Sequence, residues 1–168
     1  MKYLKLCTLV LAIAIQPAVA KAQVEFKLQI DEITDETTPI IYLNPEENRD
    51  YILLSLRCGS DSIYLFADHK FLIGNRFAGY SSAQVNVDMR FDEQPATSST
   101  WLLFDNQRVS FPGYPEGVVD NLILNATDSE NLLFRMSDNY DQLTAHYSLT
   151  GFSDALDQFD QYCDTYSR

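Results

Sequence analysis

Residues 84–92 have the sequence QVNVDMRFD, in which apolar and polar side chains alternate without a break. Val85, Val87, Met89 and Phe91 share one face at a period of two, whereas helical spacing would scatter them. The stretch therefore predicts a β-strand with one face against a core and a polar face in water. This strand indicates a fold that is built on a sheet.

Further strand patterns lie on both sides of this element. Pairs of them are separated by short polar turns such as Gly59-Ser60-Asp61, which is typical of β-hairpins. The predicted strands are 24–30, 51–58, 62–67, 100–105, 108–111, 131–136 and 143–150. The loop between 92 and 99, which contains Pro95, and a second turn at 68–70 complete this series.

Two helices are predicted in the last third of the chain. Residues 116–125 can form a short one, and Ser153 is an expected N-cap for a helix that runs to about Cys163. Because strands cluster first and a helix comes last, we expect a mostly-β fold. It is either an antiparallel sheet or a β-sandwich, with the C-terminal helix packed on it, and an α+β arrangement is the variant.

The cysteine pattern predicts one disulfide bond. Cys58 falls in phase with the apolar residues of strand 51–58, and Cys163 lies on the apolar face of the last helix. Both sulfurs should therefore face the core, where an exported chain would oxidise them to a Cys58–Cys163 bridge. Two buried thiols are the alternative.

The first twenty residues have the features of a cleaved signal peptide. Lys2 and Lys5 precede an apolar run at 6–15, and Ala18-Val19-Ala20 is a small-x-small cleavage sequence. The apolar run is shorter than the roughly 20 residues that cross a bilayer. We expect residues 1–20 to be removed together with Cys7, leaving a single exported domain at 21–168 without a membrane span, in the periplasm or secreted.

The chain is strongly acidic, with 12 basic and 24 acidic residues and a net charge of −12. Loss of Lys2 and Lys5 with the signal would bring this to −14. Such a charge repels nucleic-acid phosphates and anionic lipids and would attract a cationic partner. We therefore expect a protein partner and no nucleic acid, while solubility alone also accounts for the charge.

The sequence shows no catalytic or cofactor-binding constellation. It has two histidines, His69 in a predicted turn and His146 on the outward face of a strand, which are too few for a zinc site once the cysteines are oxidised. No nucleophile elbow and no phosphate-binding glycine loop occur. We predict a protein that is not an enzyme and needs no metal or cofactor.

Four residues are candidates for partner contact. Arg90 and Asp92 share the outward face of strand 84–92, where they either meet a partner or form a cross-strand ion pair. Phe111 and Tyr114 belong to the proline-containing aromatic turn at 111–115, which either contacts a partner or packs against the adjacent helix.

The order of several short motifs resembles the type VI secretion-associated VasI/TagO-like family of small exported bacterial proteins. The motifs are LRC at 56–58, VDMRFD at 87–92, Trp101, LLFR at 132–135, AHYSLTGF at 145–152 and Cys163. The chain departs from the family in having Asp164, where an aromatic residue often follows the last cysteine. The resemblance implies a non-enzymatic periplasmic accessory of a secretion system and brings no defined catalytic residues.

Two functions are therefore expected from the sequence. The first is an accessory or binding domain of an envelope or secretion assembly. The alternative is an acidic secreted inhibitor of a cationic hydrolase such as lysozyme, because opposite charge speeds association.

Overall fold

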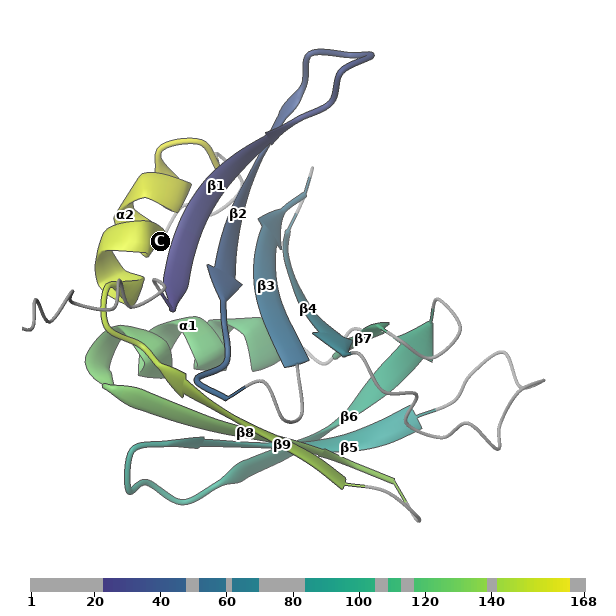
Figure 1. Ribbon diagram of the computed structural model, residues 1–168, viewed down its shortest axis with the longest axis vertical. Coiled ribbons are helices and arrows are strands. Elements are labelled where there is room, and N and C mark those ends of the chain that lie inside the picture. The colour runs from purple at the N-terminus through teal and green to yellow at the C-terminus, as the bar shows by residue number, and fades with distance from the viewer. Residues whose placement is uncertain are drawn as a thin grey trace, which may run out of the picture.

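The computed structural model describes residues 23–47, 52–59, 62–69, 84–104, 109–112, 117–138 and 142–163. Within these ranges the chain forms nine strands and two helices (Figure 1). The strands are β1 (Val24–Ile30), β2 (Thr37–Leu43), β3 (Ile52–Cys58), β4 (Ile63–His69), β5 (Gln84–Phe91), β6 (Thr97–Phe104), β7 (Val109–Phe111), β8 (Asn131–Ser137) and β9 (Gln142–Ser148). The helices are α1 (Val118–Asp128) and α2 (Phe152–Asp160).

The described strands form one antiparallel sheet in the order β1-β2-β3-β4-β7-β6-β5-β8-β9. The short strand β7 joins two four-stranded halves, because it pairs with β4 at Ala67 and Asp68 and with β6 at Leu102 to Phe104. Figure 1 shows the two halves steeply inclined to each other, with α1 in the angle between them and α2 beside β1. The prediction of a mostly-β antiparallel fold with a packed C-terminal helix is confirmed.

Alternation along the strands places the core on the side of the sheet that faces the helices. Val85, Val87, Met89 and Phe91 of β5 are all buried, as their spacing predicts. Trp101 is fully buried, stands edge-on to Phe134 with ring centroids 5.5 Å apart, and donates its indole N–H to Ser99 Oγ at 2.9 Å. A buried indole needs such an acceptor, so this residue belongs to the core.

The loop before Trp101 is shorter than the sequence indicates. β6 begins at Thr97 and pairs with β5 from Met89 to Gln84, so only residues 92–96 turn the chain. Strand β2 is also absent from the prediction, although its last residues are buried and it pairs with β1 over its whole length. Pro39 hides this strand from pattern analysis, because proline is unusual inside a sheet.

Both helices begin after a glycine in the left-handed conformation. Gly117 has φ 91° and Gly151 has φ 87°, and neither helix has a side-chain cap. The predicted Ser153 cap is therefore wrong, since α2 begins at Phe152, upstream of that serine. A positive φ favours glycine, which has no Cβ to clash with the backbone. The position of Gly151 thus decides where α2 starts.

A disulfide joins Cys58 at the end of β3 to Cys163 just after α2, with a Cα–Cα distance of 5.7 Å. This confirms the predicted pairing. The bond closes a sequence separation of 105 residues and fixes the last helix to the sheet.

Neither described helix is long and apolar enough to cross a membrane.

The two halves of the sheet are also connected near β9. Tyr147 Oη donates to the Ile52 carbonyl at 2.7 Å, Glu46 N donates to the His146 carbonyl at 2.8 Å, and Ser148 N donates to Gln23 Oε1 at 2.9 Å. These bonds join the outermost strand of one half to the other half. They leave the far end of the β1–β2 hairpin without comparable support.

Candidate protein-binding surface

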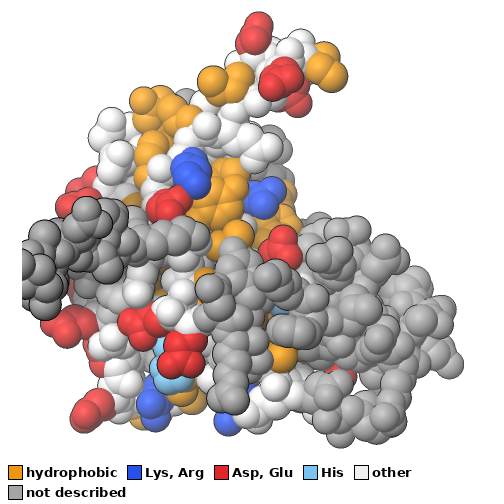
Figure 2. All heavy atoms as spheres, in the orientation of Figure 1, with side chains coloured by type: hydrophobic (Ala, Val, Ile, Leu, Met, Phe, Trp, Pro, Cys, Tyr) orange, Lys and Arg blue, Asp and Glu red, His pale blue; other side chains and the backbone are white. Residues whose placement is uncertain are grey.

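The β1–β2 hairpin projects from the body of the protein. Its register runs from Val24 opposite Leu43 to Ile30 opposite Thr37, and a turn at 31–36 closes it. Figure 1 shows this end of the hairpin extending past the helices, and Figure 2 shows acidic and apolar side chains together at its end. All side chains from Lys27 to Thr37 are exposed. The tip is therefore accessible to a partner from several sides.

The turn at the tip is held in one conformation by its own hydrogen bonds. Asp31 Oδ1 accepts the backbone N–H of Ile33 at 2.8 Å and of Thr34 at 3.0 Å. Asp31 N donates to the Glu36 carbonyl, and Asp35, at φ 57°, donates its N–H to the Asp31 carbonyl, both at 2.9 Å. The N–H groups of Ile33 and Thr34 lower the pKa of the Asp31 carboxyl, and the Ile33 bond has the larger effect. An aspartate that bonds to the following backbone is a local turn former.

An apolar strip follows the helix-facing side of the hairpin. It consists of Tyr162 at 53% exposed, Leu28 at 39% and Ile30 at 61%, and we include in it Ile33 of the adjoining turn, which is 93% exposed. Phe26 links its parts, because its ring stacks on Tyr162 at 6.0 Å and it shares a β1 face with Leu28. Of six exposed large hydrophobic residues in the described ranges, four belong to this strip. Such clustering marks an interaction surface, unlike scattered single residues.

Four carboxylates surround the strip at the tip. They are Asp31, Glu32, Asp35 and Glu36, and no basic residue occurs between 28 and 43. Aggregation through the exposed isoleucines is opposed by this charge. A partner that covers the strip must therefore bring cations to the same place.

A second surface lies on the opposite face of the first four strands. Lys27 Nζ stands 5.4 Å from the Tyr42 ring centroid, and Arg57 Cζ stands 5.3 Å from that of Phe66. Phe66 in turn stacks on Tyr64 at 6.2 Å. Figure 2 shows an apolar patch with basic side chains beside it in the middle of this view. These pairs shield the sheet face through cation–π contact.

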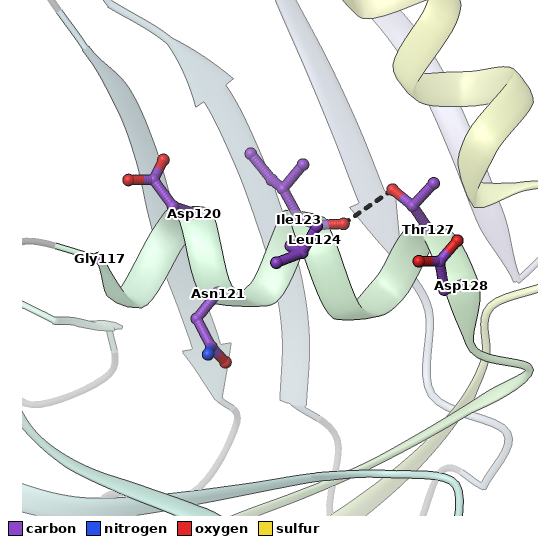
Figure 3. A pocket seen from close by; sticks show the side chains of 7 residues that line it. All are labelled: Gly117, Asp120, Asn121, Ile123, Leu124, Thr127 and Asp128. Carbon is purple, nitrogen blue, oxygen red and sulfur yellow. Dashed lines mark hydrogen bonds between the residues drawn. The ribbon is translucent and has the colours of Figure 1, made fainter. Parts of the chain in front are cut away.

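A cavity of about 500 Å³ runs along α1. Figure 3 shows Asp120 and Asp128 at opposite ends of the helix, with the exposed Leu124 between them. An adjoining cavity of about 230 Å³ extends from Gly117 and Asn121 toward Met89 and Thr97. The two carboxylates do not converge, so this groove offers no pair for acid–base chemistry.

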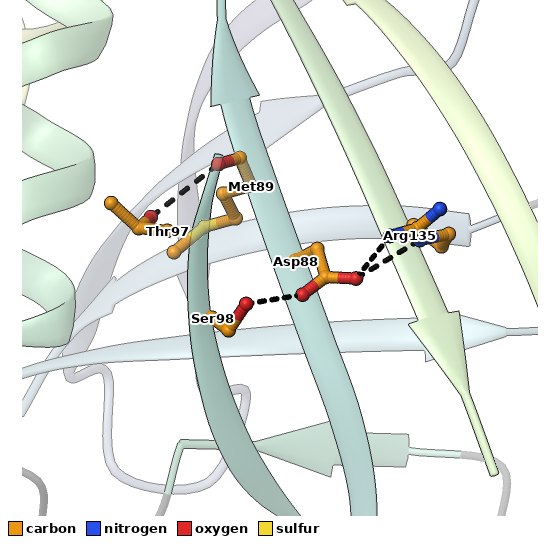
Figure 4. A network of polar contacts seen from close by, with 5 residues as sticks. All are labelled: Asp88, Met89, Thr97, Ser98 and Arg135. Atoms are coloured by element: carbon orange, nitrogen blue, oxygen red, sulfur yellow. Dashed lines mark hydrogen bonds and ion pairs between the residues drawn. The ribbon is translucent and has the colours of Figure 1, made fainter. Parts of the chain in front are cut away.

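A polar network ties three strands of the other half together (Figure 4). Asp88 Oδ2 accepts Arg135 Nη2 at 2.6 Å and Arg135 Nε at 3.0 Å, and Asp88 Oδ1 accepts Ser98 Oγ at 2.5 Å. The Ser98 bond, followed by that of Arg135, lowers the pKa of Asp88. Register places these residues directly opposite one another on β6, β5 and β8. The network therefore holds the strands in register.

The predicted pair Arg90 and Asp92 does not form an ion pair. Asp92 leaves the strand at φ 46°, and its carboxylate accepts the backbone N–H groups of Glu130 and Asn131 at 2.9–3.3 Å. Burial raises the pKa of Asp92, but those bonds lower it overall. Asp92 thus fixes the start of β8, and the cross-strand ion pair of this sheet is Asp88–Arg135 instead.

Arg90 lines a small polar cavity of about 130 Å³. Asp92, His146 and Glu46 lie around the same cavity. The tertiary structure brings these four groups together from three separate parts of the chain. Their side chains are exposed or partly exposed, so the cavity opens to solvent.

The aromatic turn is only partly visible. Phe111 ends β7 opposite Leu102, and Pro112 after it is buried, while Tyr114 lies outside the described residues. Partner contact at Phe111 and Tyr114 stays a prediction.

His69 differs from its prediction as a turn residue. It is the last residue of β4, opposite Ile52, and its side chain is fully buried. The alternation Ile63, Leu65, Ala67, His69 gives the reason, since position 69 continues the inward face. His146 is exposed on β9, as expected. No group of three metal-ligating side chains is found in the described part of the chain.

The sequence contained a signal for the hairpin tip that pattern analysis missed. Ile33 stands alone among Asp31, Glu32, Asp35 and Glu36. An isoleucine inside an acidic turn lies outside the strand alternation that buries apolar side chains, and its charged neighbours favour exposure at the tip.

Comparison of this chain with known protein families, with curated proteins and with solved structures finds no match in any of the three. The fold and the surface define a disulfide-bonded, β-rich domain with a projecting acidic hairpin.

Proposed function

We propose that this chain is an exported, non-enzymatic binding domain that contacts a protein partner through the tip of its β1–β2 hairpin. The observation that carries the proposal is Ile33, 93% exposed at the end of a turn that hydrogen bonds hold in place. Because these bonds already order the backbone of the turn, little backbone entropy is lost when Ile33 enters a pocket.

The side chains at the tip indicate which kind of partner surface would bind it. Leu28, Ile30 and Ile33 supply an apolar centre, and the four turn carboxylates supply a charged rim. Interfaces combine an apolar core with a polar rim in this way. The partner should therefore present an apolar pocket with basic residues around it, and salt should slow the association.

Export is supported by two independent features. Residues 1–20 have the pattern of a signal peptide, and the Cys58–Cys163 bond is compatible with an oxidising compartment outside the cytosol. The resemblance to the VasI/TagO-like family extends the proposal to an accessory role in a type VI secretion system.

A crosslinking experiment tests the contact surface. A photo-crosslinking amino acid is placed at Ile33 or, as a control, at Leu124, which is 68% exposed on α1. In the native envelope, one defined protein should crosslink to position 33 and not to position 124. When the chain is immobilised, the Ile33→Ser variant should no longer retain that protein, whereas the Leu124→Ser variant should still retain it.

Equal crosslinking from both positions, or equal retention by Ile33→Ser, would contradict the proposed surface. The secretion role is tested separately in a strain that lacks the gene. Effector secretion should be restored by the wild-type chain and not by Ile33→Ser, and normal secretion in the deletion strain would exclude that role.

A second function is favoured by the same hairpin. A projecting apolar residue surrounded by carboxylates is suited to enter the cleft of a cationic hydrolase such as lysozyme. Inhibition should then appear at micromolar protein, decrease as salt rises and be lost in Ile33→Ser. Unchanged lysozyme activity at low salt would remove this alternative.

A further inference from the structure

The free edge of β1 carries an inference about how the partner is held, and it rests on the proposed function. In the described part of the chain, β1 pairs on one side only, with β2. An edge strand presents main-chain N–H and C=O groups that a further strand can use.

The hydrogen-bond parity of the hairpin shows which groups point to this edge. At one end Asn44 N donates to the Gln23 carbonyl, and at the other end Asp31 N donates to the Glu36 carbonyl. Hydrogen-bonded pairs alternate along an antiparallel ladder, so Glu25, Lys27 and Gln29 direct their main-chain groups toward β2. The main-chain groups of Phe26, Leu28 and Ile30 therefore point away from it.

The opposite edge of the sheet is covered at the C-terminal end of β9, which makes the contrast informative. On β9, the His146 carbonyl receives Glu46 N, and Ser148 N is bonded to the Gln23 side chain. On β1, α2 covers the beginning of the strand, but Leu28 and Ile30 are exposed. Proline is absent from β1, and its one basic side chain, Lys27, stands over Tyr42. Neither proline nor a covering helix therefore protects the edge at Leu28 and Ile30, and the charge of the adjoining turn is the protection that a cationic strand would neutralise.

We propose that the β1 edge takes an added β-strand from the partner, an extended segment with alternating apolar side chains and basic residues at the end next to the turn. Its apolar side chains would lie beside Leu28 and Ile30, and its basic residues beside Asp31, Glu32 and Asp35. Main-chain bonds give such complexes affinity, while alternate side chains give them specificity. A second copy fits less well, because each copy carries a charge of −12 and adds four carboxylates of its own.

Amide hydrogen exchange with a synthetic peptide tests this mode. The probe is a nine-residue peptide in which valine alternates with serine and lysines occupy one end, and its control has proline at the central valines. In the free protein, the amides of Lys27 and Gln29 should exchange slowly and those of Leu28 and Ile30 quickly. With peptide bound to about nine tenths of the protein, exchange at Leu28 and Ile30 should slow about tenfold, because only the free fraction still exchanges.

Each outcome decides the matter. Protection confined to Leu28 and Ile30, and absent with the proline peptide, supports strand addition. Absence of binding at millimolar peptide, or protection without alternation, overturns it. Protection that rises with protein concentration and needs no peptide assigns the edge to a second copy and overturns the proposed occupant.

A pair of variants separates this inference from the proposed function. Leu28→Pro removes an outward N–H without breaking a bond to β2, whereas Leu28→Ala keeps the N–H and shortens the side chain. In the assay of partner retention, strand addition predicts that Leu28→Pro loses the partner and Leu28→Ala retains most of it. Equal retention by both variants, with loss in Ile33→Ser, would reject the added strand and leave the hairpin surface standing.

Discussion

Asp31 is the residue on which the shape of the hairpin tip depends. Its side chain accepts the main-chain N–H groups of Ile33 and Thr34, and its own main-chain N–H donates to the Glu36 carbonyl, so this one residue organises the turn that displays the isoleucine. Few other tertiary contacts support this turn, since all of its side chains are exposed. The conformation is therefore a local property of the sequence.

Replacement of Asp31 by alanine should loosen the tip and leave the body intact. We expect faster amide exchange at Ile33 and Thr34, because their acceptor is gone, with little change in the global unfolding midpoint. Glu32→Ala is the control, since it removes a neighbouring carboxylate that the turn does not use. Unaltered exchange at both amides would show that the turn does not need the aspartate.

The Asp88 carboxylate predicts a pH-dependent contribution to stability. Its bonds to Ser98 and Arg135 place its folded-state pKa below the unfolded value, which lies near 3.8. Such a group stabilises the fold above its unfolded pKa and loses this contribution as pH falls through the folded pKa. Asp88→Asn should cost about 1 kcal/mol or less at neutral pH, because the pair is partly exposed.

Denaturant unfolding of wild-type and Asp88→Asn protein over a range of pH measures this. The difference between them should be constant above the ordinary aspartate range and disappear in acid. A difference that grows as pH falls would mean that the sign of the pKa shift is reversed.

At the scale of elements, the start of α2 depends on backbone conformation and not on a cap. Gly151 is at φ 87° with open space where a Cβ would lie, so a substitution there meets backbone strain alone. Gly151→Ala should lower the free energy of unfolding by about 1–2 kcal/mol, as measured by urea denaturation. Ser153→Ala should change it by less than about 0.5 kcal/mol, since this exposed serine caps nothing. A larger loss at Ser153 than at Gly151 would restore the serine as the cap.

The contrast between the two outer strands shows how elements acquire different roles. β9 is bonded to residues from the other half of the sheet, while the outer half of β1 is left exposed. Both strands alternate in a similar way in the sequence. Their edges differ at these positions because distant residues, Gln23 and Glu46, bond to β9.

At the scale of the whole molecule, the disulfide joins β3 to the residue just after α2 and reduces the conformational entropy of the unfolded chain. Cys58→Ser and Cys163→Ser should destabilise the protein equally, and the double variant should be no worse than either. The loss should be at most about 4–5 kcal/mol, the chain-entropy value for a loop of this size. Thermal unfolding of the three variants measures this, and clearly additive losses would argue against pairing.

The net charge also acts on the whole molecule. With −12 distributed over the chain and four carboxylates at the tip, association with a cationic partner should weaken as salt screens the charges. The apolar centre of the hairpin strip is not screened in this way. Salt should therefore change the association rate more than the dissociation rate.

Local patterns in the sequence determined the strands, the pairing of the cysteines and the mostly-β class. Val85 to Phe91 alternate at a period that only a strand satisfies, and the cysteines follow the apolar faces of their own elements. Local patterns were insufficient for β2, where Pro39 interrupts the alternation, and for His69, which is buried at a strand end. The alternation of apolar and polar residues predicts which face of a strand a residue occupies, but it does not predict which element covers that face.

Tertiary structure alone decided the candidate surface. Leu28 and Ile30 alternate like core residues, yet they are exposed on the part of the hairpin that extends past α2 (Figure 1). Arg90 and Asp92 are two residues apart, yet Asp92 turns away to bond to the start of β8, while Arg90 lines a cavity together with His146 of another strand. Burial and pairing depend on contacts between residues far apart in the chain, and a periodic sequence does not record those contacts.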